Sequence, residues 1–257
     1  MNSYREFIET ITATVDQAKS LPLGDVAPCS TPELPDDAPR VLIFSPHPDD
    51  ECIIGTLPLR LLREDAFHVV NIAVTQGSRK ERQQARFEEV KQACRFLGFS
   101  LMQTREGGLE KIKPETRQND PEHWQQCVET VQNILQHQNP QLIFLPHAAD
   151  WNGTHVGTHH LVLDALTGMG RDFSCGLLET EYWQPMSAPN LMVECSSDML
   201  ADLVAGLSHH KGEVARNPYH LLLPAWMQDN VRRGSELIGG QGGEAPNLYF
   251  ATLYRLK

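Results

Sequence analysis

The chain has 257 residues, of which 40% are hydrophobic and 21% charged, so it can form one large α/β domain or two small ones. Its formal net charge of −11 argues against a nucleic-acid or anionic-membrane partner, because either partner requires a basic face. We expect no membrane span and no secretory signal. The six cysteines form no CxxC pair, which argues against a cysteine zinc site and favours a reducing, cytoplasmic location.

The first 39 residues are predicted to lie outside the main domain. Residues 2–20 have apolar side chains at helical spacing and predict an amphipathic helix. The segment that follows is rich in proline and acidic residues, which is typical of an extended connector. We therefore expect an N-terminal helical arm with its connector at 1–39 and a single domain at 40–257.

From residue 40 onward, predicted strands and helices alternate. Apolar runs predict strands at 40–45, 68–77, 100–106, 141–147, 176–183, 190–196 and 247–256. Helical patterns occupy 53–65, 80–99, 121–140, 154–170, 197–214 and 224–239. This alternation predicts βαβ units, so we expect an α/β fold with a Rossmann-like, mainly parallel sheet flanked by helices. The segments after residue 172 are expected to complete one side of the sheet and one wall of the site.

Two predicted strands end in loops that carry histidines and acids. The sequence FSPHPDDECIIG (44–55) ends the first strand, and HAADWNGTH (147–155) ends the fourth. In open α/β sheets, ligands bind beyond the carboxyl ends of the strands, so two such loops would face one another across a crevice. A metal site, an acid–base site, or both would explain so much charge at the end of a buried strand.

Histidine nitrogen and carboxylate oxygen are a ligand set for zinc, and a catalytic zinc keeps one position open for water. His47 and Asp50 are three residues apart, so a turn that enters a helix can direct both at one ion. The second loop would supply the third ligand. Asp49 points differently and would hold the water and take its proton. The alternative is a solvated turn, in which the two aspartates only complement the N-terminus of a helix.

The motif PHPDDE (46–51) resembles the signature of the LmbE-like, or PIG-L, family of zinc-dependent N-deacetylases. TQGS (75–78) and RFEEVKQACRFLG (86–98) are similar to further family motifs, and the resemblance runs from about residue 40 to residue 160. It implies a Rossmann-like fold and a hydrolase that removes an N-acetyl group from a small-molecule amino sugar or glycoconjugate. It also implies Zn²⁺ as cofactor, although another divalent metal would suit the same ligands.

The resemblance implies roles for individual residues of the two loops. His47 and Asp50 correspond to zinc ligands and Asp49 to the general base. Aligning the second loop on the family's H-P-D-H motif places His155 at the position of the third ligand. His159, one helical turn further on, remains an alternative ligand or an orienting group.

The second loop also departs from the family pattern. Asn152 stands where the family has a histidine that stabilises the oxyanion or protonates the leaving amine. His147, Asp150 and Asn152 itself are the candidates to replace that histidine, and an asparagine amide can donate to an oxyanion but cannot shuttle a proton. Trp151 and His210 are predicted to contact substrate. For His210 the alternative is a solvated helix end.

Two other kinds of function compete with the hydrolase. A non-hydrolytic, metal-holding binding or scaffold protein of the same fold would be consistent with the departure at Asn152. A phosphoesterase with two metal ions would require a further acid cluster, which the sequence lacks. Glu51 is expected to brace the first loop, and the sequence leaves open whether the chain forms a homo-oligomer.

Overall fold

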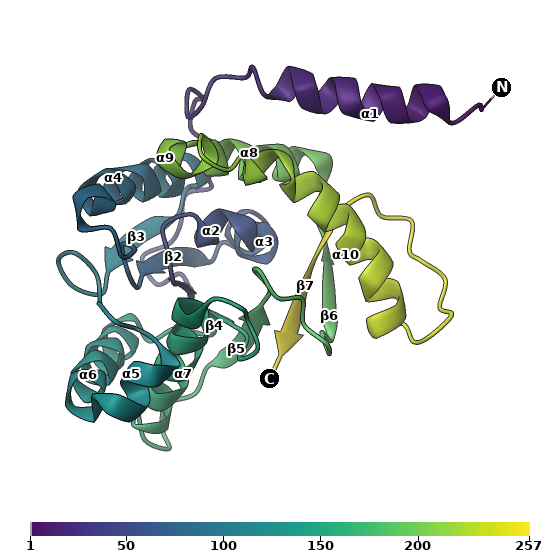
Figure 1. Ribbon diagram of the computed structural model, residues 1–257. Helices are drawn as coiled ribbons and strands as arrows, with labels where there is room; N and C mark the ends of the chain where they lie inside the picture. The colour runs from purple at the N-terminus through teal and green to yellow at the C-terminus, as the bar shows by residue number, and fades with distance from the viewer. Residues whose placement is uncertain (1) are drawn as a thin grey trace.

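The computed structural model describes residues 2–257 and contains a seven-stranded sheet at its centre (Figure 1). The strands lie in the order β3-β2-β1-β4-β5-β7-β6. Their bounds are β1 (Arg40–Ser45), β2 (His68–Ala73), β3 (Ser100–Gln103), β4 (Leu142–Pro146), β5 (Gly176–Thr180), β6 (Leu191–Glu194) and β7 (Ala251–Leu256). β1 to β5 pair in parallel, and β7 pairs antiparallel with β5 and β6. The predicted α/β fold with a mainly parallel sheet is confirmed.

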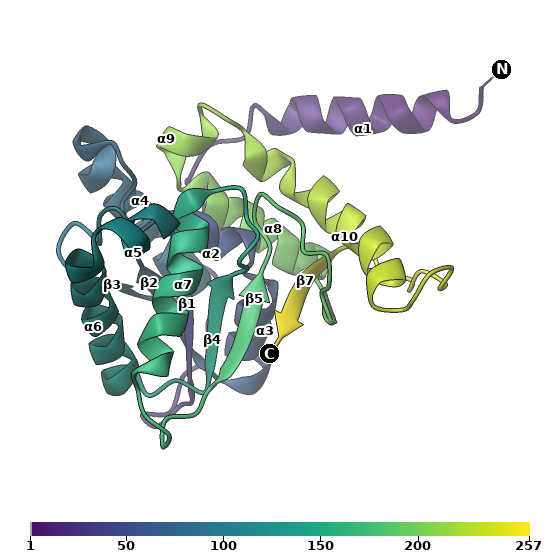
Figure 2. The same ribbon diagram turned by 60° about the horizontal axis from the view of Figure 1, so that its bottom comes forward.

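Helices cover both faces of the sheet, so the central strands are apolar on both sides. In β1, Val41 and Ile43 face one core while Leu42 and Phe44 face the other. The first core includes side chains of α2 (Asp50–Ile53), α3 (Thr56–Asp65), α4 (Lys80–Leu97), α8 (Ser197–Ser208) and α10 (Leu223–Leu237). The second includes side chains of α6 (Pro121–Gln138) and α7 (Gly153–Thr167), against which α5 (Pro114–Asn119) packs (Figure 2).

The N-terminal arm is present as α1 (Arg5–Ala18), which projects from the body of the protein in both views (Figures 1 and 2). α1 contains no buried residue. The connector, unlike α1, contacts the domain: Leu23, Cys29 and Leu34 pack against the first core. The Cys29 amide also donates to the Phe96 carbonyl over 3.0 Å. The boundary at residues 39 and 40 stays a prediction. No helix within the described residues is long and apolar enough to cross a membrane.

Two predicted helices are each divided in the structure. The segment 53–65 separates into the end of α2 and the whole of α3, and the segment 197–214 separates into α8 and α9 (Lys211–Val214). The second break falls at His209 and His210, where His210 turns inward to a buried carboxylate. A short 3₁₀ helix, η1 (Tyr219–Leu221), follows and brings Tyr219 to the same edge of the sheet.

Candidate functional site

The two histidine-bearing loops meet at the carboxyl edge of the sheet, as their positions predict. β1 and β4 are parallel neighbours, so the loop after β1 and the loop after β4 emerge side by side. His47 and Asp50 come from the first loop, and His155 lies in the first turn of α7. The metal-binding atoms of these three residues all lie within 4.8 Å of one another.

The spacing of these atoms fits a zinc ion. His47 Nδ1 lies 3.1 Å from His155 Nε2, and Asp50 Oδ2 lies 3.6 Å and 3.5 Å from these two nitrogens. Tetrahedral zinc with bonds of about 2.0–2.1 Å separates its ligand atoms by roughly 3.3–3.4 Å. The three side chains are therefore spaced as ligands of one zinc ion would be.

The backbone of the first loop fixes the directions of its acids. The Asp50 carboxylate accepts a hydrogen bond of 2.8 Å from the His47 amide, which holds both ligands in one turn. Asp49 precedes α2 with a φ of 119°, a left-handed conformation that residues other than glycine rarely adopt. Strained backbone of this kind is concentrated at functional sites. The turn thereby separates Asp49 from Asp50, although the two are adjacent in sequence.

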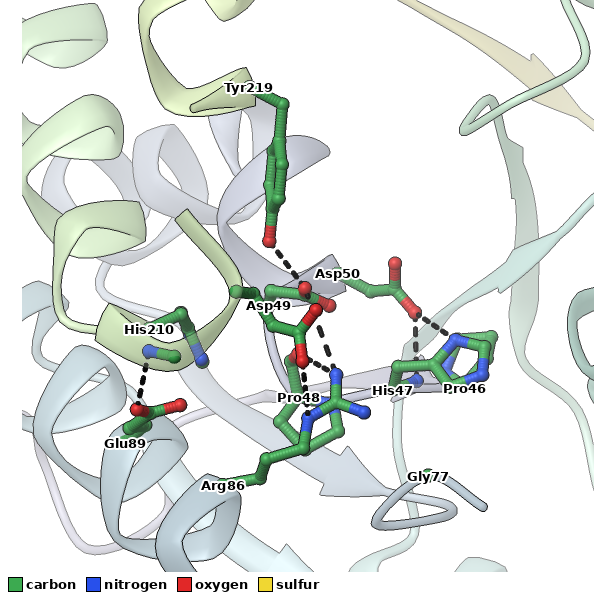
Figure 3. A network of polar contacts seen from close by, with 12 residues as sticks. Pro46, His47, Pro48, Asp49, Asp50, Gly77, Arg86, Glu89, His210 and Tyr219 are labelled. Carbon is green, nitrogen blue, oxygen red and sulfur yellow. Dashed lines mark hydrogen bonds and ion pairs between the residues drawn. The ribbon is translucent and has the colours of Figure 1, made fainter. Parts of the chain in front are cut away.

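Asp49 lies among groups that bind its carboxylate (Figure 3). The Tyr219 hydroxyl donates to Asp49 Oδ2 over 2.5 Å, and Arg86 Nη2 lies 3.8 Å from the same oxygen. Burial and the neighbouring Asp50 carboxylate raise the pKa of Asp49 to about 7, against the opposing effects of Arg86 and Tyr219. Asp49 Oδ1 has no hydrogen-bond partner among the described residues, so this is the oxygen available to a ligand.

The pKa values of the two histidines of the cluster shift in opposite directions. Burial lowers the pKa of His47, which favours the neutral ring that binds a metal. Burial also opposes protonation of His155, but the Asp50 and Asp150 carboxylates outweigh it and raise the His155 pKa. The Asp50 pKa is lowered, because the charges and hydrogen bonds of His155 and His47 outweigh the effect of burial. A divalent cation would compete for the proton of His155, since metal binding and ligand deprotonation are coupled.

Asp150 orients His155 from behind. Asp150 Oδ1 lies 3.6 Å from His155 Nδ1, and its carboxylate also accepts hydrogen bonds from the Asn152 and Trp183 amides. The edge of the Tyr182 ring packs on His155, with ring centroids 4.7 Å apart. A carboxylate behind a ligating histidine fixes its ring orientation. Asp150 therefore lies where a carboxylate would support His155, and its part in replacing the missing histidine stays a prediction.

Glu51 and His210 form a buried pair that braces the first loop. His210 Nε2 lies 2.7 Å from Glu51 Oε1, and both side chains are fully buried. Glu51 Oε2 accepts a hydrogen bond of 3.0 Å from the Asp49 amide. The expected bracing role of Glu51 agrees with these contacts. His210 is buried against Glu51 in this arrangement, and its contact with substrate stays a prediction.

Both ring nitrogens of His147 face backbone groups. Its Nε2 lies 2.7 Å from the Gln184 carbonyl and its Nδ1 lies 3.3 Å from the Ala149 amide. Both ring nitrogens are engaged by backbone, so the ring holds the loop after β4 and is not free to act on a substrate. His159 is likewise engaged, with Nδ1 lying 2.8 Å from the Pro146 carbonyl, and it does not join the cluster.

The side chains of Asn152 and Trp151 are accessible to solvent, Asn152 partly and Trp151 largely. The Asn152 side-chain oxygen accepts the Thr154 amide over 2.8 Å and caps α7, so its amide NH₂ group is free to donate. Trp151 is 75% exposed, which leaves its predicted contact with substrate open.

Two cavities flank the cluster. A polar cavity of about 450 Å³ is bordered by His47, Asn152 and the segment 109–113. Gly157 permits this segment to approach α7, because a Cβ at this position would lie 2.4 Å from the Ile112 carbonyl oxygen. An apolar cavity of about 170 Å³ lies on the other side, where Tyr182 and Tyr219 form part of its wall. The larger cavity has the size of a typical small-molecule site.

Tyr219, Arg86 and Asp150 surround the site in ways that the sequence analysis did not predict. Arg86 donates to the Pro48 carbonyl over 3.0 Å and approaches Asp49 (Figure 3). The signal available for Arg86 was its place in the R-x-x-E motif, whereas Tyr219 lies 170 residues from Asp49 and has no local signal.

Several solved structures have a fold similar to that of this chain. N,N′-diacetylchitobiose deacetylase from Pyrococcus horikoshii has a TM-score of 0.60 and 15% identity, covering 100% of this chain and 93% of its own. The A40926 pseudoaglycone deacetylase Dbv21 has a TM-score of 0.63 and 16% identity, with coverages of 86% and 98%. The 4-carboxy-2-hydroxymuconate hydratase GalB from Pseudomonas putida KT2440 has a TM-score of 0.64 and 15% identity, with coverages of 85% and 95%. Because deacetylases and a hydratase share this fold, activity has to be argued from the site.

The fold and the site together define an α/β protein with a candidate mononuclear metal centre and a carboxylate beside it. Residues 42–166 match the family model described as PIG-L, GlcNAc-PI de-N-acetylase. The resemblance predicted from the sequence is thereby confirmed over this segment, which is similar to the PIG-L, or LmbE-like, family. No curated protein matches the chain.

Proposed function

We propose that the chain is a metal-dependent hydrolase that removes an N-acetyl group from an amino-sugar-type substrate. The observation that carries this proposal is the position of Asp49 beside the cluster of His47, Asp50 and His155. The polar cavity of about 450 Å³ next to His47 supports a sugar-sized ligand. The family match at 42–166 and the deacetylases that share the fold support the same reaction class.

His47, Asp50 and His155 would hold Zn²⁺ or another divalent metal, in agreement with their spacing. When bound, such an ion polarises an acyl oxygen and lowers the pKa of a water molecule toward ~7. The contacts of Asp49 and Asn152 suggest a separate role in the reaction for each of these side chains.

Asp49 is the proposed general base. Its Oδ2 is held by Tyr219 and Arg86, so Oδ1 takes a proton from the attacking water. The same oxygen returns that proton to the leaving nitrogen, because the ring nitrogens of His147 are engaged by backbone. The products are acetate and a free amine. The Asn152 NH₂ group is the proposed donor to the oxyanion that forms from the acyl oxygen when water attacks the acyl carbon.

A non-hydrolytic scaffold is the less favoured function. A binding protein does not require a carboxylate that is held by Tyr219 and Arg86 beside the cluster of His47, Asp50 and His155. The cytoplasmic location, the N-acetylated sugar or glycoconjugate as partner, and a homo-oligomer stay predictions.

The test is a hydrolysis assay with controlled metal content. Zinc-loaded protein is expected to release equimolar acetate and amine from a panel containing N-acetylglucosamine, N,N′-diacetylchitobiose and N-acetylglucosaminides. A chelator should abolish release and added zinc should restore it. His155→Ala should lose both zinc and activity, whereas His160→Ala, one position beyond His159 on the same helix, should keep both. Full activity of the metal-free protein, or zinc-loaded protein that leaves the whole panel intact, would contradict the proposal.

A further inference from the structure

A second polar cavity, of about 130 Å³, lies behind the candidate base. Four arginines contribute to its lining, together with Gln76, Ser78 and Glu213; the arginines are Arg79, Arg82, Arg86 and Arg216. Figure 3 places Arg86 directly beneath Asp49, with the loop of Gly77 beside it. A cluster of arginines is unexpected in a chain whose net charge is −11.

The positive charge of this cavity exceeds its negative charge. Glu213 is the single carboxylate of the lining, and it pairs with Arg82 Nη2 at 2.9 Å, with Arg86 Nε at 3.6 Å and with Arg216. Asp49 lies 3.8 Å from Arg86 on the far side. Four guanidinium groups thus meet two carboxylates, a surplus of two charges (4 − 2). Arg79 has no carboxylate within 4.0 Å among the described residues.

Buried donors in the same cavity lack partners. Gln76 is 1% exposed, and neither its amide nitrogen nor its amide oxygen has a hydrogen-bond partner within the described part of the chain. Arg86 Nε is also buried without a hydrogen bond. Buried polar groups are almost always paired, so unpaired ones mark a place where a ligand or water supplies the partner.

The start of α4 adds a further attraction for anions. α4 begins at Lys80, and its N-terminal boundary residue Arg79 makes no side-chain capping bond. The free N–H groups and the positive end of the helix dipole in such a turn favour an oxyanion. Ser78, Arg79 and Arg82 place this first turn at the wall of the cavity.

We propose that this cavity binds a phosphate monoester group carried by the substrate. A surplus of two positive charges matches a group that carries ≈ −1.5 to −2 charges at neutral pH. Arginine forks bind phosphate oxygens in bidentate fashion. Arg86 borders both the cavity and Asp49, and Ser78 borders both this cavity and the 450 Å³ polar cavity. The substrate is therefore an N-acylated amino sugar with a phosphate monoester, an assignment that rests on the proposed function.

A structural ion-pair network is the competing explanation. Glu213 could serve only to hold α9 against α4 through Arg82 and Arg86. That arrangement accounts for the paired arginines. It does not explain why Arg79 has no carboxylate partner, or why the buried amide of Gln76 has no hydrogen-bond partner, among the described residues. Variants of these two residues therefore separate a ligand site from a structural network.

The experiment measures binding by calorimetry on the zinc-loaded Asp49→Asn protein, so that no turnover is required. N-acetylglucosamine 6-phosphate should bind at least ~10-fold more tightly than N-acetylglucosamine, a difference of about 1.4 kcal/mol. The double variant Arg79→Gln/Arg216→Gln should lose this preference. The matched control Arg60→Gln/Arg232→Gln alters two exposed, ion-paired arginines elsewhere and should keep it. Because phosphate can also reach the metal centre, the comparison of these variants assigns the preference to the cavity.

Gln76→Met provides a second readout. If Gln76 serves a ligand, its replacement should weaken sugar-phosphate binding about tenfold without lowering the melting temperature, since a buried unpaired amide contributes no stability. Equal affinity for N-acetylglucosamine 6-phosphate and N-acetylglucosamine would overturn the proposal. A preference for the phosphorylated sugar that persists in Arg79→Gln/Arg216→Gln would overturn it as well. Tight binding of inorganic phosphate without any gain for the sugar phosphate would overturn the assignment to substrate. A phosphate preference in a protein that hydrolyses no N-acetyl sugar would leave the site standing and refute the proposed function alone.

Discussion

At the scale of single residues, the contact between Tyr219 and Asp49 joins two distant parts of the chain at the carboxylate of the proposed base. A hydrogen bond to a charged group contributes about 1.5–3 kcal/mol. We expect Tyr219→Phe to lower kcat by at least about tenfold while zinc content and KM stay near those of the wild type. Steady-state kinetics with elemental analysis checks this. Tyr249→Phe, at an exposed position, is the control. An unchanged kcat in Tyr219→Phe would show that this hydroxyl does not support the base.

Residues within one short motif were the easiest to predict. His47, Asp49 and Asp50 follow one strand, so the local pattern and the family resemblance both located them. His155 followed from the second loop. His147, His210 and Tyr219 could not be placed, because their roles depend on partners that are far away in sequence. His210 meets Glu51 over a separation of 159 residues, and His147 is engaged by a carbonyl 37 residues away.

At the scale of elements, the buried ion pair of His210 and Glu51 ties the start of α9 to α2. Breaking a buried pair costs about 3–5 kcal/mol. Burial opposes protonation of His210, but the Glu51 charge outweighs it and raises the His210 pKa above its ordinary value of 6.5. The folded state is thus the form that binds the proton more tightly. The contribution of this ion pair to the free energy of unfolding is fully present below about pH 6.5. It is lost as the pH rises through the pKa that His210 has in the folded state.

We therefore expect His210→Gln to lower the free energy of unfolding most strongly near pH 6 and progressively less at alkaline pH. Denaturant unfolding of both proteins across this pH range measures the difference. His137→Gln, at an exposed position on α6, should show little difference at any pH. A destabilisation that grows with rising pH would contradict the assigned direction of the pKa shift.

The N-terminal arm and its connector should respond differently to truncation. α1 contributes no buried residue, whereas Leu23, Cys29 and Leu34 of the connector pack on the core. Removal of residues 2–20 should leave the melting temperature within about 2 °C of the full chain. Removal of residues 2–39 should lower it clearly, because each buried apolar side chain contributes about 1.5–3 kcal/mol. Equal melting temperatures for the two truncations would instead support the predicted boundary at residue 39.

The alternation of strands and helices was predictable because each element has its own periodicity. The breaks within 53–65 and 197–214 were not, because apolar periodicity continues through them. In the second case tertiary contacts decide the break, since His210 leaves the helical path to reach Glu51. The parallel pairing of β1 to β5 agrees with the predicted βαβ units, but the antiparallel pairing of β7 between β5 and β6 depends on long-range packing.

At the scale of the whole molecule, a metal that binds only the folded state stabilises it. At a free zinc concentration of 1,000 Kd the gain is ≈ 4.1 kcal/mol. For a chain of 257 residues this corresponds to a rise in melting temperature of roughly 10 °C. Thermal unfolding with zinc and with chelator should show this difference in the wild type. It should disappear in His155→Ala, and a rise that persists in this variant would mean that zinc binds elsewhere.

The measurement that tests the central claim most directly pairs zinc content with turnover in Asp49→Asn. Asp49 is not one of the three proposed ligands, and its substitution removes the proton acceptor while preserving the size of the side chain. We expect about one zinc per chain, as in the wild type, and a loss of acetate release of at least about 10²-fold. Near-full acetate release by the zinc-loaded Asp49→Asn protein would contradict the role of Asp49 as general base.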